Sequence, residues 1–455
     1  MQAQYISEVM EYTPAPGQFI NASPWGQPQS AFSIEGGVNG TLCLGAFGGS
    51  VVFRFEQPVV NHPDNPFGVD FTIFGNPAAD WSEPGIVWVM EDLNGNGAPD
   101  DLWYELAGSD FHFSSTIRDY QVTYTNPGNE QGKDIPWADR YGNTGFILAN
   151  TAHMQPYYPS ADSFPDIPEE GYTLSGSMIT GAVDVDHPPI LRSAERAFGY
   201  VDNRFRGNSP YTVPDNPYTP GIENSGGDAF DISWAVDRDG NYMDLDSIHF
   251  IKVQNALLHE GGWLGEVSTE ITGAVDVEPD KHLTGNLELV VIKDLPEEIH
   301  TTELQLEVFV FHQGRLQTGR DVSWTTSADW ATVNEGHLLT ASGSGPLILT
   351  ASLTGNPLVW ASVSTVIHAP NTSFPDRIKK EQGMSLYPNP ASEWIHLSGA
   401  GDAIISILDL SGKTLKQVRT SPGHGDIRIS ELPAGVYLVR AEYPGRTDWC
   451  KLLKE

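Results

Sequence analysis

The chain has 455 residues, of which 39% are hydrophobic and 18% charged, a balance typical of folded rather than disordered proteins. Its formal net charge of −34 excludes nucleic acid and anionic membrane surfaces as favoured partners, because like charges repel. A chain of this length is too long for one hydrophobic core, so we expect about two to four domains. The 46 glycines and 33 prolines favour turns and short strands over long helices.

Residues 1–278 are expected to form a jelly-roll-like β-sandwich. Short runs rich in β-branched and aromatic residues recur along this stretch, each bounded by Gly, Pro, Asn or Asp. Examples are Ser50–Phe55, Gly85–Met90 and Ile248–Val253. Helical periodicity is scarce, and the predicted fold class is therefore all-β.

Tryptophans close to glycine or proline are the candidate ligand-binding residues of this first domain. Exposed aromatic rings stack on sugars and on other flat ligands. The candidates are Trp81, Trp137 and Trp263. Trp88 and Trp234 lie inside strand patterns instead, so we expect both to be buried.

The segment 92–101 has the D-x-N-x-N-G pattern of calcium-binding loops. Alternating side chains turn their oxygens toward one centre, and Gly97 permits a sharp bend. An EF-hand would need Glu at the position of Trp103, so the loop resembles the thrombospondin and dockerin types more closely. Glu83 could add a ligand from a distance, and a turn without an ion is the alternative. The predicted calcium ligands are Asp92, Asn94, Asn96, Ala98 through its carbonyl oxygen, Asp100 and Asp101.

A second acidic segment spans residues 237–246, but its spacing suits calcium less well. Asp239 and Gly240 lie between two strand patterns and predict a tight hairpin turn. We therefore favour a plain turn here and leave metal binding open.

Residues 283–368 are expected to form an Ig-like sandwich. Short alternating strand patterns recur in it, as in Glu303–Phe311 and Leu347–Leu353. A polar, proline-containing stretch without periodicity follows at residues 369–383 and is interpreted as a linker.

Residues 384–455 form a third small domain in this interpretation. Strand patterns flank a glycine-containing turn at Asp409–Lys413, and a second turn at residues 433–435 leads into the strand Val436–Val439. The motifs and their order resemble the type A C-terminal sorting domain of the type IX secretion system. The matching positions are Tyr387, Pro388, Asn389, Pro390, Pro433, Gly435 and Tyr437.

This resemblance implies export by the type IX secretion machinery to the outer cell surface, with an N-terminal signal peptide already removed. Segments of the first domain, among them residues 44–49, 82–86 and 230–236, resemble bacterial cell-surface proteins of unsettled function. That second resemblance implies an outer-membrane uptake receptor as a partner and a corrinoid as one candidate ligand.

Enzyme signatures are scarce in the sequence. No Ser has Gly two residues away on both sides, and His259-Glu260 lacks the second His of a zinc protease. The predicted function is therefore a calcium-stabilised binding protein for a glycan or a small-molecule nutrient. Two alternatives stay open: a glycan-degrading hydrolase or lyase on the same domain, which needs only two carboxylates, and an adhesive or structural surface protein.

Overall fold

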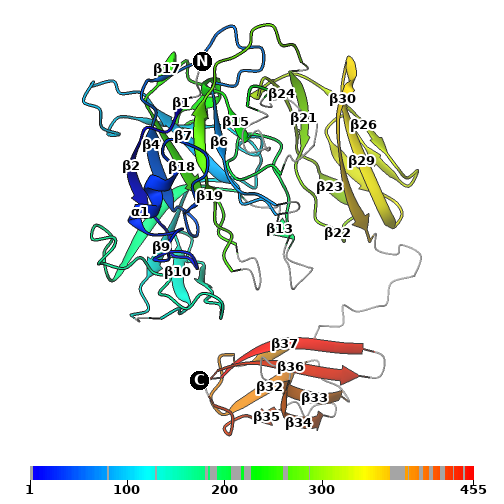
Figure 1. Ribbon diagram of the computed structural model, residues 1–455. Helices are drawn as coiled ribbons and strands as arrows, with labels where there is room; N and C mark the ends of the chain where they lie inside the picture. Colours follow the sequence, from blue (N-terminus) through cyan, green and yellow to red (C-terminus); the bar gives the residue numbers. More distant parts are fainter. Residues whose placement is uncertain are drawn as a thin grey trace. The chain divides into compact units, whose positions relative to one another are not determined.

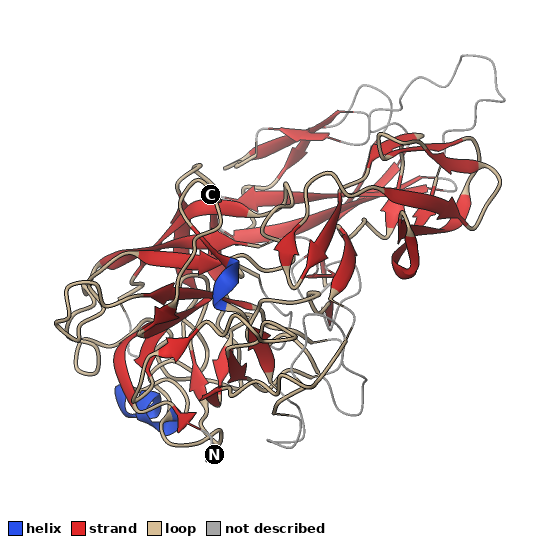
Figure 2. Ribbon diagram, turned by 90° about the horizontal axis from the view of Figure 1, so that it is seen from above, coloured by secondary structure: helices blue, strands red, loops and turns tan. Residues whose placement is uncertain are grey.

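The chain is organised as two compact units, residues 1–370 and 371–455, in which strands predominate (Figures 1 and 2). Helical structure among the described residues is confined to short turns, such as α1 (Pro28–Ala31), and no described helix is long and apolar enough to cross a membrane. The predicted all-β class is confirmed. The computed structural model describes residues 4–78, 81–128, 131–179, 183–184, 192–205, 217–219, 227–259, 265–285, 287–368, 385–387, 389–398, 403–408, 413–420, 426–433, 435–443 and 446–454.

The first domain is built on two antiparallel sheets that share one core. The larger sheet has six strands, in the order β16 (Ala235–Val236), β8 (Trp103–Leu106), β7 (Gly85–Met90), β18 (Phe250–Asn255), β4 (Ser50–Arg54) and β2 (Glu8–Thr13). The smaller sheet has four, in the order β1 (Gln4–Tyr5), β20 (Gly273–Asp276), β6 (Phe71–Phe74) and β15 (Asp228–Phe230). Fully buried side chains from both sheets, including Phe53, Val89, Phe71 and Phe230, belong to one apolar cluster, as in a β-sandwich.

A second four-stranded sheet of this domain has its own core. Its order is β11 (Thr144–Ile147), β10 (Ile135–Asp139), β9 (Ile117–Thr125) and β12 (Gly171–Met178). The alternation along β9 buries Tyr120, Val122 and Tyr124 and exposes the residues between them, because successive side chains point to opposite faces of a strand. Three short strand pairs complete the domain: β3 (Leu42–Cys43) with β19 (Glu270–Ile271), β5 (Val59–Val60) with β17 (Ser247–Ile248), and β13 (Val183–Asp184) with β14 (Arg192–Ser193).

Strands β21 to β30 pair only with one another and form three small sheets. Their orders are β21 (Glu288–Ile292), β24 (Val308–His312) and β25 (Arg315–Leu316); β22 (Glu298–Ile299), β30 (Asn356–Ile367), β29 (Gly345–Leu353) and β26 (Val322–Thr326); and β23 (Glu303–Gln305), β28 (Leu338–Ala341) and β27 (Ala331–Val333). This Ig-like part packs firmly on the first domain. Phe311 belongs to the first domain's core, and the indole N–H of fully buried Trp234 donates to the carbonyl of Gln313 at 2.7 Å.

The described residues of the C-terminal unit form seven strands and a separate core. Its sheets are β31 (Ser385–Tyr387), β32 (Trp394–Ser398) and β35 (Asp426–Arg428), and β34 (Thr414–Thr420), β33 (Ala403–Leu408), β36 (Gly435–Tyr443) and β37 (Arg446–Lys454). Ile395, Ile405, Ile407, Val439 and Leu452 fill the space between them. The predicted linker 369–383 lies outside the described residues.

Candidate functional site

The outer face of the six-stranded sheet carries a row of chemically different side chains. On β7, Val87 and Val89 point into the core, so the alternating Trp88 points to the other face. Strand register sets Lys252 of β18 on one side of Trp88 and Glu105 of β8 on the other. A cation, an aromatic ring and a carboxyl group are thereby aligned across three neighbouring strands.

This row forms the floor of a pocket of about 550 Å³. Trp103 of β8 extends the floor, and residues 175–177 of β12 form part of the wall. Its volume lies within the range of small-molecule sites, about 300–1,000 Å³. The pocket combines aromatic surface with eight charged side chains, five acidic and three basic, so its lining is more polar than that of most ligand sites.

Lys252 is held between two tryptophans. Its ammonium nitrogen lies 4.9 Å from the ring centroid of Trp88 and 5.0 Å from that of Trp103. Such positions are attractive because the face of an indole ring is electron-rich. Burial lowers the pKa of Lys252 to about 8, although the carboxylates of Glu11 and Glu105 act in the opposite direction. The side chain is thus charged at neutral pH.

Glu105 is a buried carboxyl group in the same floor, with 6% of its surface exposed. The hydroxyl of Ser177 donates to its Oε2 at 2.5 Å. Burial raises the pKa of Glu105 to about 7, while this hydrogen bond and the charges of Arg118 and Lys252 oppose the shift. Glu105 can therefore exchange a proton near neutral pH.

The indole N–H of Trp88 is buried and has no hydrogen-bond partner among the residues that the structure describes. An unmet buried donor costs free energy, on the order of 1–3 kcal/mol. Nearby, Gly176 lines the pocket, and a Cβ atom there would lie 1.9 Å from Oε1 of Gln254. Glycine at this position therefore keeps the wall free of a side chain and leaves room for the amide of Gln254.

The predicted calcium loop joins β7 to β8, and its last residue, Asp101, lies at the edge of the pocket. Gly95 and Gly97 adopt positive φ angles of 70° and 72°, a conformation that glycine adopts at little cost. Asp92 accepts hydrogen bonds from the backbone N–H groups of Asn96 and Gly97, at 3.1 and 2.9 Å. The loop thus bends where the sequence indicated.

The remaining predicted ligands also take part in hydrogen bonds within the loop. Asp101 accepts from the backbone of Leu93 at 2.9 Å. The side-chain amides of Asn94 and Asn96 donate to Asp100, and these two bonds lower the pKa of its carboxyl group. The carbonyl of Ala98 accepts from the backbone N–H of Asp100 at 2.9 Å. The predicted ligands are adjacent, and calcium binding by them stays a prediction.

The second acidic segment forms a turn that borders the same pocket. Asp237 accepts from the backbone N–H groups of Asp239 and Asn241, both at 2.9 Å, and Gly240 has a φ of 85°. Asp237, Arg238 and Asp239 line the pocket edge. Sequence indicated this turn but not its place beside the loop at residues 92–101.

A buried carboxyl group cluster lies elsewhere in the first domain. Oxygens of Glu83, Asp202 and Glu270 approach within 4.8 Å of one another, the only such acidic group found among the described residues. Burial raises all three pKa values, and the mutual repulsion of Glu83, Asp202 and Glu270 adds to the effect on Asp202 and Glu270. The group could hold a divalent cation through carboxylate oxygens, or share protons. The sequence could not reveal this cluster, because its members lie far apart along the chain. Glu83 belongs to the cluster and does not lie at the loop of residues 92–101, where the sequence suggests it as an additional calcium ligand.

Of the three predicted ligand-binding tryptophans, the two that the structure describes do not line this pocket. Half-buried Trp81 lines a separate pocket of about 300 Å³, where its side chain hydrogen-bonds to Glu83. Trp137 lies on β10, against the core of the second four-stranded sheet. Trp263 lies outside the described residues. The pocket uses Trp88 and Trp103 instead. Trp88, which the sequence predicts to be buried, is half-buried and faces away from the core. The β7 sequence contains no polar residue, so no alternation in it distinguishes the two faces.

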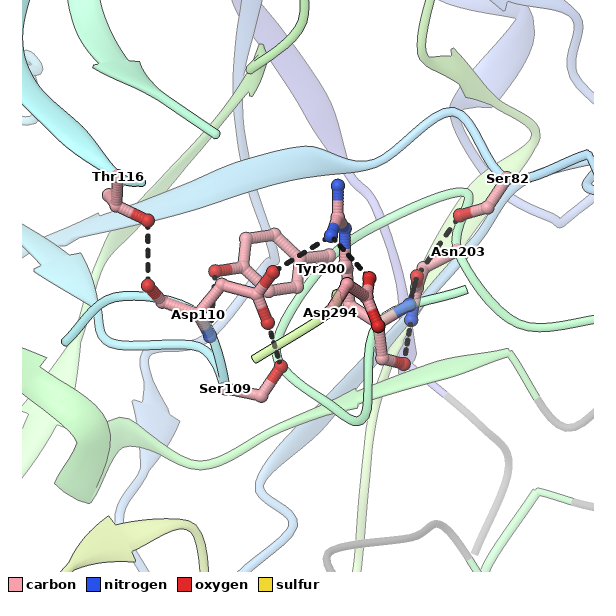
Figure 3. Close-up of polar contacts among 8 residues, drawn as sticks. Ser82, Ser109, Asp110, Thr116, Tyr200, Asn203 and Asp294 are labelled. Atoms are coloured by element: carbon pink, nitrogen blue, oxygen red, sulfur yellow. Dashed lines mark hydrogen bonds and ion pairs between the residues drawn. The ribbon is translucent and has the colours of Figure 1, made fainter. Parts of the chain in front are cut away.

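A polar network links the first domain to the Ig-like part (Figure 3). Arg196, with 4% of its surface exposed, lies 3.0 Å from a carboxylate oxygen of Asp110 and 3.6 Å from one of Asp294. Asn203 also accepts from the backbone of Arg196, at 2.6 Å. A pocket of about 310 Å³ lies beside this network. Because Arg196 already has two carboxylate partners from the two parts, we assign it a structural role.

In the C-terminal unit, two predicted sorting residues have clear structural roles. Asn389 makes two hydrogen bonds to the backbone of β37. Its Oδ1 accepts from the N–H of Leu453, and its Nδ2 donates to the carbonyl of Lys451, both at 2.8 Å. The Tyr437 hydroxyl donates to the carbonyl of Pro433 at 2.7 Å. Tyr387 ends β31, Gly435 begins β36, Pro390 is exposed, and Pro388 lies outside the described residues.

Comparison with known families identifies this unit. Residues 385–455 match the family described as secretion system C-terminal sorting domain. The chain is therefore a cargo of the type IX secretion system, secreted and located at the outer cell surface. A search of curated protein sequences found no match.

Several solved β-sandwich structures are distantly similar. The Escherichia coli adhesin FdeC is 12% identical over 46% of this chain and 78% of its own, with a TM-score of 0.17. Extracellular domains 3–5 of Drosophila OTK are 12% identical over 48% of this chain and 83% of their own, with a TM-score of 0.19. The Yersinia pseudotuberculosis adhesin InvE is 11% identical over 37% of this chain and 58% of its own, with a TM-score of 0.13. TM-scores this low carry no information on function.

Proposed function

We propose that this surface protein binds a glycan in the pocket on the outer face of its six-stranded sheet. The observation that carries the proposal is the row formed by Lys252, Trp88 and Glu105, with Trp103 beside it, at the floor of a cavity of about 550 Å³. Sugar rings are bound by aromatic faces for their C–H surfaces and by charged or amide groups for their hydroxyls. This pocket offers both kinds of group.

A calcium ion in the loop at residues 92–101 would support this role in our proposal. The loop connects the two strands that supply Trp88, Trp103 and Glu105. An ion there would fix the loop and reduce the negative charge of the pocket edge at Asp101. In this role calcium stabilises the loop and makes the electrostatic potential of the pocket less negative, and it takes no part in catalysis.

A small-molecule nutrient is a second ligand class for the same pocket, with a corrinoid as the candidate and an outer-membrane uptake receptor as the partner that would accept it. The comparisons bear on secretion only, so this possibility is best treated as one arm of the same binding screen.

Catalysis on a bound glycan is a second candidate function, and one specific observation favours it. The pKa values of about 7 for Glu105 and about 8 for Lys252 lie near neutral pH, where a general acid and base act most efficiently. A lyase or hydrolase would release products from a bound glycan, and the variant Glu105→Gln would abolish that release while leaving binding largely intact.

A glycan array probed with the full chain tests the proposal, with corrinoids screened in parallel. We expect binding to a restricted set of glycans and a loss of at least ten-fold in affinity for the variant Trp103→Ala. The matched control is Trp360→Ala, because Trp360 of β30 is 58% exposed and lies outside the pocket. Equal losses in the two variants, or no glycan binding at all, would refute the pocket as a glycan site.

A further inference from the structure

We infer that the ligand bound in this pocket carries a carboxylate, as an acidic sugar does, and that Lys252, Arg118 and the indole N–H of Trp88 receive it. This inference rests on the proposed function and specifies its ligand class. Three separate observations on the described residues support it.

Two basic side chains in the pocket have no carboxylate oxygen within 4.0 Å among the residues that the structure describes. Lys252 contacts the rings of Trp88 and Trp103, and no ion pair within 4.0 Å is found for it. Arg118 lies over the ring of Phe111 at 5.3 Å and donates to the backbone carbonyl of Arg238 at 3.3 Å. The chain has 59 acidic residues and only 25 Lys and Arg residues, so basic groups that line one pocket without an ion pair are notable.

Three of the five carboxyl groups that line the pocket accept hydrogen bonds from the chain itself, and Asp119 and Asp239 are the other two. Asp101 accepts from the backbone of its loop at 2.9 Å, and Asp237 accepts from the backbone of its turn at the same distance. Glu105 accepts from Ser177 at 2.5 Å. These groups shape the pocket edge and floor, but they do not neutralise Lys252 or Arg118 by direct contact.

The unmet N–H of Trp88 completes a set of donors. Trp88 lines the same pocket as the two cations, and its N–H, which is buried, lacks an acceptor among the described residues. A carboxylate has two oxygens and about four acceptor positions, so it can receive an ammonium, a guanidinium and an indole N–H together. Bonds of a carboxylate to cationic donors are roughly twice as strong as neutral ones. A neutral sugar hydroxyl would leave the cations without compensation.

Trigalacturonic acid and its trimethyl ester form a suitable pair of probes, because they have nearly the same shape and differ in charge. We expect the full chain to bind the acid at least ten-fold more tightly than the ester, in a salt-dependent manner. The variants Lys252→Met and Arg118→Gln should each reduce that preference several-fold. Lys281→Met is the matched control, because Lys281 pairs with Asp64 and lies outside the pocket.

The wild-type comparison keeps the test decisive even if a variant fails to fold. Equal binding of acid and ester, or tighter binding of the ester, would overturn the inference. If neither probe binds while a neutral glycan on the array does, the inference fails and the proposed function stands. If no glycan binds, both fail.

Discussion

The two faces of the six-stranded sheet differ sharply although they belong to the same strands. The inner face carries Val87, Val89 and Phe53, all fully buried in the core, whereas the outer face carries Trp88, Glu105 and Lys252 around a pocket. Strand geometry alone produces this division, because successive side chains alternate between faces. The comparison teaches that the inner face is apolar throughout, whereas the outer face combines a small buried apolar cluster of Val52, Met90 and Phe250 with the charged and aromatic groups of the pocket.

The largest expected change in stability comes from a substitution that leaves a cavity in the apolar inner face of the sheet. Phe53→Ala should lower the free energy of unfolding by about 3–5 kcal/mol, because it leaves a cavity in a closely packed core. Lys252→Met on the outer face should change it by less than about 1 kcal/mol, since the loss of ring contacts offsets the relief of burying a charge. Denaturant unfolding of the full chain measures both. A similar cost for the two variants would contradict the division of the sheet.

Glu105 should make stability depend on pH. Its pKa is about 7 in the folded chain against an ordinary 4.5, so the folded state binds more protons between these values and stability falls as pH rises through them. Glu105→Gln removes this cost, so it should stabilise the chain at pH 8 by on the order of 3 kcal/mol. At pH 4 the variant and the wild type should match. Thermal unfolding at both pH values provides the measurement, and a pH-independent difference would argue against a buried, protonated Glu105.

Binding of an acidic sugar should weaken above pH 8. Lys252 loses its charge as pH rises through its pKa of about 8, whereas Arg118 stays charged. Glu105 also becomes negative above about pH 7, so the changes at Lys252 and Glu105 act in the same direction. We expect an affinity loss of about ten-fold between pH 6.5 and 9.5, measured by titration calorimetry. The Lys252→Met variant should lose much of this dependence, and an unchanged profile would remove Lys252 from the site.

Calcium should have the smallest effect. Chelation by EDTA is expected to lower the thermal midpoint by a few degrees, since a bound ion stabilises the folded state by mass action. A variant with Asp92→Asn and Asp100→Asn should lose this response, whereas Glu83→Gln should keep it. The reverse pattern would assign the ion to the buried carboxyl group cluster of Glu83, Asp202 and Glu270. An absence of any shift would remove calcium from the account.

Local sequence patterns predicted those features that depend on neighbouring residues. The all-β class, the glycine bends of the loop at residues 92–101, the turn at Asp237–Asn241 and the sorting domain all have signals within a few tens of residues. The sorting domain had the most specific sequence signal, since several of its family's motifs occur there in the right order.

The pocket and the carboxyl group cluster could not be predicted in this way. Trp88, Glu105 and Lys252 meet only because β7 pairs with β8 and with β18, and β18 lies more than 140 residues later in the chain. The same holds for Glu83, Asp202 and Glu270. Long-range strand pairing brings such residues together, and no local periodicity encodes the choice of partner strand.

Hydrogen–deuterium exchange of the full chain, with and without a glycan identified on the array, tests most directly whether the outer face of the sheet is the ligand surface. The account predicts that the ligand slows exchange in β8, in residues 175–177 of β12 and in the turn at Asp237–Asn241, with little change in the Ig-like part. Protection centred on β29 and β30, with none at β8, would contradict it.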